Sequence, residues 1–207
     1  ALYVNRERIP TSELSSIAQL ADPKYKGKLV IDDCRVAAGG TSTLVGLWQA
    51  GGEPFVRTIL KDQAPAFSET KRITAEWVAT GRYPIGIGVD DQELAKLKQE
   101  GVGSNVELFS YDGGNITSNG IAAFKNAPNP NAAKVFVNWF LSREGQIAWS
   151  EAWSRPIDRN SRRSDVPVRN PGAYPDHSKL DQYAIWGTDT GTRVVKAVTE
   201  ACKEAYP

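Results

Sequence analysis

Residue types that often carry chemistry are scarce in this chain of 207 residues, which holds one histidine, two cysteines and no methionine. The single histidine, His177, has no second histidine with which to hold a metal and no Gly-x-Ser-x-Gly motif to serve. No apolar run approaches the ~18 residues of a membrane-spanning helix. The net charge is only +1, which gives no reason to expect nucleic-acid binding. These absences argue against a histidine-based enzyme and against a nucleic-acid-binding protein.

An active site built from carboxylates or a thiolate is also poorly supported. Asp32–Asp33 and Asp90–Asp91 are adjacent pairs, and adjacent residues of a strand point to opposite faces. A reactive thiolate needs a clearly positive neighbourhood, and Cys34 has only Arg35 beside it in the sequence. We therefore expect a protein that is not an enzyme and needs no cofactor.

The two cysteines allow two interpretations. Hydrophobic residues make up 41% of the chain, which is enough for a packed core. In an exported protein Cys34 and Cys202 could form one disulfide; otherwise they are buried thiols that pack as small hydrophobic side chains. Because the sequence does not show that their Cα atoms approach each other, we favour the two thiols.

Hydrophobic patterns predict strands that alternate with helices along most of the chain. The expected strands are 29–31, 85–89, 106–109 and 121–124, and the expected helices are 43–50, 54–60, 70–80, 92–100, 131–141, 142–153 and 192–205. Residues 154–191 interrupt the pattern as a long loop rich in proline and arginine. Such alternation is typical of a layered α/β domain.

An ordered set of segments carries a family resemblance. They are Asp22–Ile31, Trp77–Ile87, Asn119–Lys125, Lys125–Gln146 and Arg163–Val166. In this order they resemble the extracellular solute-binding proteins of ABC importers, in the type 2 periplasmic binding branch that includes ferric-iron binders. The resemblance implies an α/β lobe of the type 2 periplasmic binding fold, with a mixed sheet flanked by helices.

The resemblance also implies that part of the family's fold lies outside this chain. Such proteins usually begin with a lobe of roughly a hundred residues before the Asp22–Pro23 turn, and we expect this chain to be a piece that lacks it. Residues 1–112 would form the second lobe, and residues 113–153 the hinge return and helices of the first lobe. Residues 154–207 would form a wrap and a helix that packs back on the second lobe.

A protein of this family would capture a small polar or charged solute between two lobes and present it to an ABC permease in the membrane. The solute could be an oxyanion, a metal or a chelate, and a polyamine or a sugar stays open. The protein would act in the periplasm or elsewhere outside the cytoplasm, without a nucleic-acid partner. Two alternatives are an effector-binding sensor domain of a regulator, which shares the two-lobed design, and a hydrolase.

Gly39, Gly40, Thr41 and Ser42 form the first expected solute-binding segment. They lie between an expected strand and an expected helix, where glycine permits close approach to a ligand and helix amides favour negative charge. The resemblance places a ligand contact of the second lobe at this position. The alternative is an ordinary helix-capping loop, because Ser and Thr commonly cap helices.

Asp90 and Asp91 form the second expected segment, at a strand end before a helix. Ferric-iron relatives carry paired tyrosines in this neighbourhood, and the tyrosine pair is missing here. The two aspartates could hold a metal, a cationic solute or a hydroxyl-rich one. The alternative is that they cap the following helix.

Asn115 and Thr117 belong to a polar, glycine-rich stretch between two expected strands. We expect this stretch to act as the hinge between lobes, with these two side chains able to reach the cleft. The alternative is a plain exposed loop.

Overall fold

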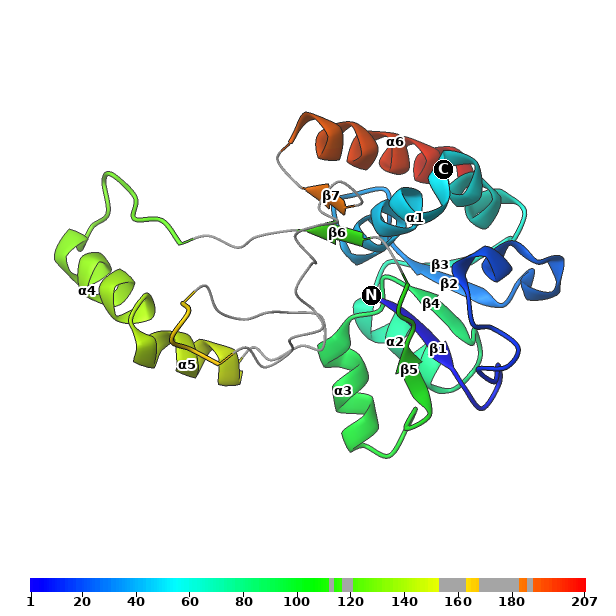
Figure 1. Ribbon diagram of the computed structural model, residues 1–207, viewed down its shortest axis with the longest axis horizontal. Coiled ribbons are helices and arrows are strands. Elements are labelled where there is room, and N and C mark those ends of the chain that lie inside the picture. Colours follow the sequence, from blue (N-terminus) through cyan, green and yellow to red (C-terminus); the bar gives the residue numbers. More distant parts are fainter. Residues whose placement is uncertain (112–113, 117–120, 153–162, 168–182, 186–187) are drawn as a thin grey trace. The chain divides into compact units, whose positions relative to one another are not determined.

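The computed structural model describes residues 1–111, 114–116, 121–152, 163–167, 183–185 and 188–207 (Figure 1). The chain divides into two compact units, one of Ala1–Thr117 with Asp181–Pro207 and the other of Ser118–Leu180. The assignment of residues 1–112, 113–153 and 154–207 to particular lobes of a larger fold stays a prediction.

A five-stranded mixed sheet forms the centre of the first unit, as expected. Its strand order is β3-β2-β4-β1-β5 (Figure 1). Strand β2 runs parallel to β3 and β4, and β1 runs antiparallel to β4 and β5. The strands span Leu2–Asn5 (β1), Leu29–Asp32 (β2), Ala66–Ser68 (β3), Ile85–Ile87 (β4) and Val106–Leu108 (β5).

The helices of this unit cover both faces of the sheet. Helix α1 (Gly39–Lys61) packs on one face and α6 (Asp189–Ala205) packs on α1, while α2 (Lys71–Ala79) and α3 (Asp91–Gln99) pack together on the other. Alternate strand residues therefore enter two separate cores: Ile31 lies in the core that includes α1, and Val30 lies in the one that includes α2. Because helices cover both faces, the sheet is buried on both sides, and groups that could contact a solute are expected at the strand ends.

The first helix contains a break that the sequence predicts. Gly52 has φ +80°, a left-handed conformation that suits glycine, and Pro54 follows it. The expected helices 43–50 and 54–60 are thus the two halves of α1. Two short 3-10 helices, Ile17–Ala21 and Pro23–Tyr25, connect β1 to β2.

Some expected elements differ from the structure. The strand expected at 121–124 is wrong, because these residues form neither helix nor strand. Strands β1 and β3 are not predicted by the sequence. Strand β3 has only three residues, and its two outer ones are alanine and serine, so it gives little hydrophobic signal. A two-stranded parallel sheet of β6 (Gly114–Ile116) and β7 (Tyr183–Ile185) also forms, and both strands contact α1.

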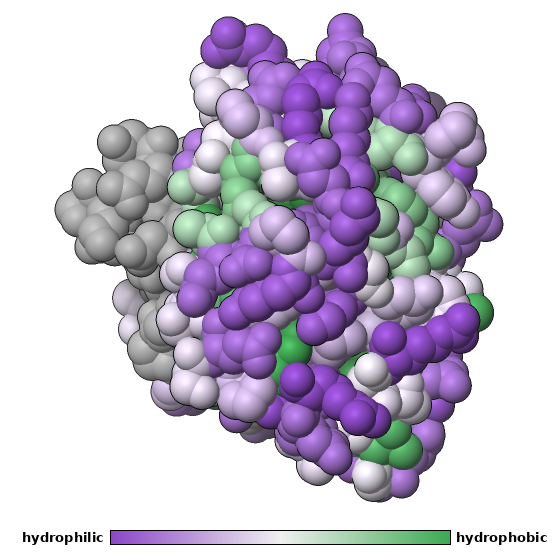
Figure 2. Space-filling view, turned by 90° about the vertical axis from the view of Figure 1, so that its right-hand side faces the viewer, coloured by the Kyte–Doolittle hydropathy of each residue, from purple (hydrophilic) through white to green (hydrophobic). Residues whose placement is uncertain are grey.

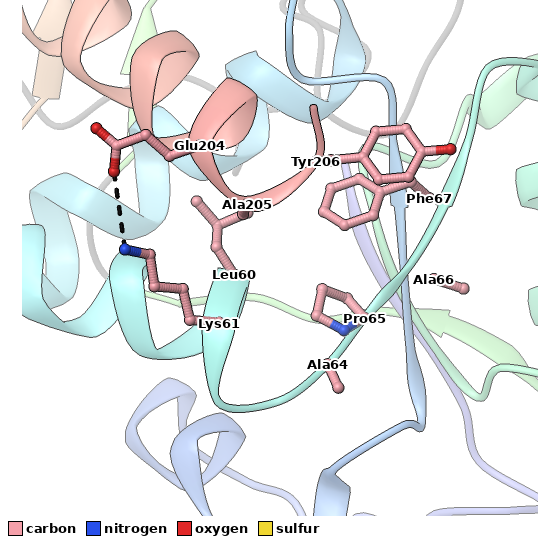
Figure 3. A pocket seen from close by; sticks show the side chains of 9 residues that line it. All are labelled: Leu60, Lys61, Ala64, Pro65, Ala66, Phe67, Glu204, Ala205 and Tyr206. Carbon is pink, nitrogen blue, oxygen red and sulfur yellow. Dashed lines mark ion pairs between the residues drawn. The ribbon is translucent and has the colours of Figure 1, made fainter.

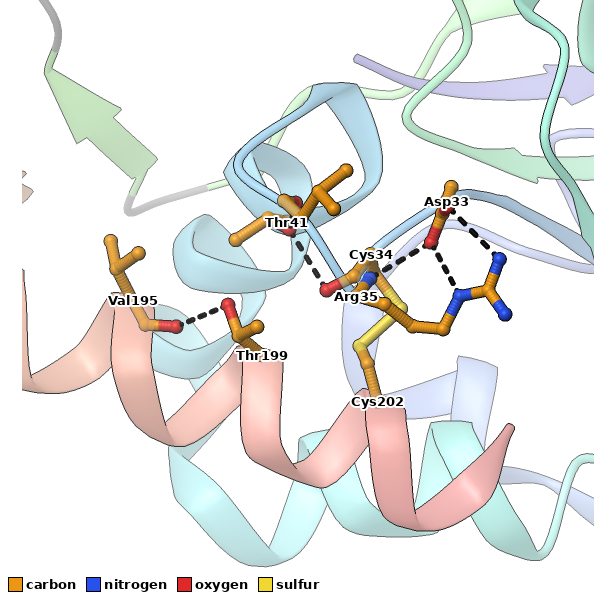
Figure 4. Close-up of a disulfide and its surroundings, with 8 residues drawn as sticks. Asp33, Cys34, Arg35, Thr41, Val195, Thr199 and Cys202 are labelled. Carbon is orange, nitrogen blue, oxygen red and sulfur yellow. Dashed lines mark hydrogen bonds and ion pairs between the residues drawn. A yellow bond between two sulfur atoms is a disulfide. The ribbon is translucent and has the colours of Figure 1, made fainter. Parts of the chain in front are cut away.

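A disulfide joins the loop after β2 to α6, so the favoured interpretation of two free thiols is wrong. Cys34 and Cys202 are both fully buried, with Cα atoms 5.8 Å apart across a sequence separation of 168 residues (Figure 4). The sequence could not show this approach, because it depends on α6 returning to pack on α1. The bridge fixes the last turns of α6 against the loop that leads into α1.

The second unit contains helices α4 (Pro130–Phe140) and α5 (Arg143–Ala152), close to the ranges expected for them. Phe140 and Trp149 pack edge-on with ring centroids 5.4 Å apart, which joins the two helices. Helix α4 nevertheless has no buried residue. Its exposed apolar side chains and those of flanking residues are Phe124, Val135, Phe136, Trp139 and Leu141.

Within the residues that the structure describes, no helix is both long enough and apolar enough to cross a bilayer. The molecular face in Figure 2 is mostly hydrophilic, and hydrophobic side chains gather there only in small patches.

Removal of the disulfide should destabilise the fold. We expect the double substitution Cys34→Ser with Cys202→Ser to lower the free energy of unfolding by about 2–5 kcal/mol, since the bridge closes a very long loop. Urea unfolding followed by circular dichroism measures this. A reductant should lower the stability of the wild type toward that of the variant and leave the variant unchanged. Equal stability of all four samples would contradict the prediction.

Candidate functional site

Two segments that the sequence singled out meet at one edge of the sheet. Strands β2 and β4 are parallel neighbours with Ile31 opposite Ile87, so their carboxyl ends lie side by side. A Cβ atom built on Gly88 would lie only 2.5 Å from the Gly40 amide nitrogen, and one on Gly39 would lie 2.7 Å from the Gly88 carbonyl oxygen. Segments 39–42 and 88–92 are therefore in backbone contact, at the edge where open α/β sheets usually bind ligands.

The first of these segments is the opening turn of α1. Its N-cap residue, Ala38, has no side chain that could cap the helix. Thr41 is fully buried, and the backbone carbonyl oxygens of Cys34 and Val36 both lie within hydrogen-bond distance of its hydroxyl, whose single hydrogen they share. Ser42 is half-buried, and its amide donates to the Ala38 carbonyl. The Thr41 hydroxyl thus stabilises its own loop (Figure 4), while a solute contact by any of the four residues 39–42 stays a prediction.

A carboxylate that was not among the expected site residues lies beneath this turn. Asp32, the last residue of β2, is only 4% exposed. Burial raises the pKa of its carboxyl group, while the nearby Gly40 amide and the positive charge of Lys71 act in the opposite direction. The sequence signal was available: an aspartate at the carboxyl end of a strand, followed by glycines at a helix start.

Asp90 acts as the N-cap of α3, which is the alternative that the sequence left open. Its Oδ1 accepts from the amides of Gln92 at 3.0 Å and Glu93 at 3.2 Å, and its Oδ2 pairs with Lys71 Nζ at 3.1 Å. Partial burial opposes ionisation, but the Lys71 hydrogen bond and the two amides outweigh it and lower the pKa of Asp90. Asp90 is thus held ionised by groups of the protein itself.

Asp91 also has an internal partner, because the Tyr3 hydroxyl donates to its Oδ1 at 2.6 Å. Within the described part of the chain, no group of three or more His, Cys, Asp or Glu side chains is placed to hold a metal ion. Metal binding by Asp90 and Asp91 therefore stays a prediction that would need ligands from elsewhere.

Of the two residues expected at the hinge, Asn115 lies within the part of the chain that the structure describes. Asn115 lies in the middle of β6, where it is the register partner of Ala184 in β7. Thr117 lies outside the described residues. A contact of either residue with solute stays a prediction.

An open pocket of about 540 Å³ lies elsewhere in the same unit (Figure 3). It is formed by the end of α1, the start of β3 and the end of α6, with Phe67 and Tyr206 stacked 4.4 Å apart on its wall. Because β3 runs parallel to β2, this pocket is at the opposite strand end from Asp32. It shares no lining residue with the expected solute-binding segments. Its lining residues are Leu60, Lys61, Ala64, Pro65, Ala66, Phe67, Glu204, Ala205 and Tyr206.

The sequence of residues 1–175 matches a family described as bacterial extracellular solute-binding proteins. The chain belongs to this family. The mixed sheet with helices on both faces and the meeting of two strand-end loops agree with the membership.

Individual members of the family and individual solved structures are also similar to this chain. It is 31% identical over 191 residues to a Haemophilus influenzae protein described as uncharacterized, covering 87% of this chain and 53% of the relative. It is 26% identical over 216 residues to iron uptake protein A2 of Synechocystis, covering 89% of this chain and 62% of the relative. The fold resembles iron-bound HitA of Pseudomonas aeruginosa, with a TM-score of 0.64 at 18% identity, over 100% of this chain and 66% of HitA. The chain thus spans between about half and two thirds of each of these proteins.

The backbone contact at Gly88 makes a testable prediction. Gly88 and Gly101 have nearly equal positive φ angles of +87° and +84°, but a Cβ on Gly101 would meet nothing within 4 Å. Gly101→Ala should therefore cost only the left-handed strain of about 1–2 kcal/mol. Gly88→Ala should cost about 1–3 kcal/mol more, since the methyl group would collide with the first turn of α1. Urea unfolding measures both, and equal losses would contradict the contact.

The N-cap of α3 at Asp90 leads to a second testable prediction. Asp90→Ala should lower the unfolding free energy by about 1 kcal/mol at neutral pH, because α3 loses its N-cap. The folded-state pKa is lowered from 3.8, so this stabilisation is present above that value and is lost as pH falls through the lower folded pKa. Lys71→Ala, which keeps the cap and removes only an exposed ion pair, should cost less. Thermal unfolding between pH 2 and 7 measures the stability of both variants. A stability difference between wild type and Asp90→Ala that persists at pH 2 would contradict the predicted pH dependence.

Proposed function

We propose that this chain is part of the solute-binding component of an ABC transporter, which captures a small polar or charged solute for uptake by a membrane permease. The observation that carries the proposal is the backbone contact between segments 39–42 and 88–92 at the carboxyl edge of β2 and β4, in a member of the extracellular solute-binding family. That edge brings helix N-terminal amides and carboxylates to one place. Binding without turnover is the activity that these groups support.

The exposed apolar side chains on and before α4 support the proposal that this chain supplies one lobe and part of another. Phe124 is 85% exposed and Val135 70%, which is unusual for side chains of this kind unless another surface covers them. The chain spans only part of the length of its relatives, so the covering surface would belong to the part of the family's fold that this sequence does not span. Residues 113–153 would then belong to the same lobe as that surface, and α6, which packs on α1, would complete the second lobe.

Several kinds of solute fit this edge. Two relatives bear iron in their names or titles, but the aspartates at 90 and 91 already accept hydrogen bonds from Lys71 and Tyr3. We therefore propose an oxyanion or an anionic metal chelate, bound through backbone amides at residues 39–42 and the Ser42 hydroxyl, with Asn115 and Thr117 contributing from the hinge. A bare metal ion would instead need oxygen ligands, which backbone amides do not supply. The aspartates would act at the margin of the bound solute.

The disulfide supports an extracytoplasmic location, because such bridges form and persist in oxidising compartments. We propose the periplasm, where the protein would present bound solute to its permease.

A screen of the full two-lobed protein tests the proposal. Thermal unfolding in the presence of phosphate, ferric citrate, divalent metals, spermidine and simple sugars should show stabilisation by one class of solute. For that solute, Ser42→Ala should weaken binding about fivefold, as expected for the loss of roughly 1 kcal/mol of hydrogen bonding. Ser104→Ala, an exposed loop serine away from this edge, should leave the affinity unchanged. Hydrolytic turnover, or stabilisation by none of these classes, would contradict the proposal.

A further inference from the structure

We propose that Lys71 is a solute-binding residue, whose ammonium group gives this edge of the sheet its preference for anions. The inference rests on the proposed function, because it assigns a further contact in the same solute site. Lys71 was not among the expected site residues. It lies on a third loop of the edge where segments 39–42 and 88–92 meet.

Three parallel strands bring three helix starts to this edge. Strand β2 pairs in parallel with both β3 and β4, so the carboxyl ends of all three lie on the same side of the sheet. Helix α2 begins at Lys71, directly after the short turn that follows β3. Lys71 Nζ lies 3.1 Å from Asp90 Oδ2, and Asp90 comes two residues after Gly88, which is in backbone contact with Gly40. The ammonium group therefore lies beside the two segments expected to bind solute.

A lysine is a poor residue for the place that Lys71 occupies. The amino end of a helix carries partial positive charge, which favours acidic side chains and disfavours basic ones. The first turn of α2 has no acidic residue, and it contains both Lys71 and Arg72. Arg72 forms ion pairs with Glu93 and Glu100, which join α2 to α3. Within the described residues Lys71 forms one exposed ion pair, with Asp90, and such a pair stabilises no more than the helix dipole costs. Stability alone therefore does not explain Lys71.

The ammonium group of Lys71 keeps hydrogen atoms for a ligand. Its side chain is 62% exposed. An ammonium group carries three donor hydrogens, and within the described chain Nζ has one acceptor, the Asp90 carboxylate. Asp90 is itself held by the amides of Gln92 and Glu93, so it keeps the ammonium group at the edge without using all of its donors. Two hydrogens remain for oxygen atoms of a bound anion.

Carboxylates of the same edge already have partners within the protein. Asp33 and Glu69, which directly follow β2 and β3, both pair with Arg35, at 3.0 and 2.6 Å. Asp91 accepts a hydrogen bond from the Tyr3 hydroxyl. A cationic solute would have to compete with these internal partners, whereas an anion would meet the remaining ammonium hydrogens.

Titration calorimetry of the full two-lobed protein with inorganic phosphate, ferric citrate and spermidine tests the inference. For the anion that binds, Lys71→Met should lower the affinity about tenfold, because the side chain keeps its length and loses a charge-assisted hydrogen bond. Lys96→Met is the matched control. Lys96, in the last turn of α3, is 58% exposed and also forms one carboxylate pair, with Glu93, and its substitution should leave the affinity unchanged.

Asp90→Asn separates a direct contact with solute from support of the loop. Asparagine also caps helices, but it lacks the charge that competes with the solute for Lys71. This variant should therefore bind the anion about threefold more tightly, as the loss of an exposed ion pair permits. A lysine that only supported the loop through Asp90 would give weaker binding in both variants.

Unchanged affinity in Lys71→Met, or weaker binding of the anion in both Lys71→Met and Asp90→Asn, would overturn the role of Lys71 and leave the proposed function standing. Binding of spermidine that Lys71→Met strengthens would do the same. Binding of no class of solute would overturn the proposed function, and the role of Lys71 with it.

Discussion

Contact between two backbones at the carboxyl edge of the sheet is the constraint on which this unit depends. The opening turn of α1 and the turn after β4 approach so closely that Gly39, Gly40 and Gly88 cannot carry side chains without displacement of their neighbours. Helix α1 can then begin directly above β2, and the two segments expected to bind solute become adjacent. Sheet pairing places the carboxyl ends of β2 and β4 side by side, and the glycines allow the loops that follow these strands to come into backbone contact.

Much of the fold could be predicted from hydrophobic periodicity and turn residues. The α/β class, the break of α1 at Gly52 and the approximate spans of α2 to α6 follow from them. The order of strands does not, because β1 pairs with β4 and β5 over a long sequence separation. The wrong strand at 121–124 came from an apolar run that stays exposed at Phe124, and local composition alone does not reveal whether a partner covers it.

The site could be located from the sequence but not described. The segments at 39–42 and 88–92 could be named, because both stand at strand ends before helices. The partners of their side chains could not, since Tyr3 reaches Asp91 and Lys71 reaches Asp90 only in the folded chain. The closeness of Asp32 to the first turn of α1 could not be read from the sequence either, because that turn folds back over the end of β2. Electrostatic roles of this kind depend on tertiary neighbours.

The disulfide has a consequence for how the protein is made. Cys34 belongs to the loop beneath the first turn of α1, and its partner Cys202 lies near the end of α6. Until α6 has been synthesised, Cys34 has no correct partner within this chain. Oxidation of this pair therefore has to follow the synthesis of nearly all of these residues, 168 positions after Cys34.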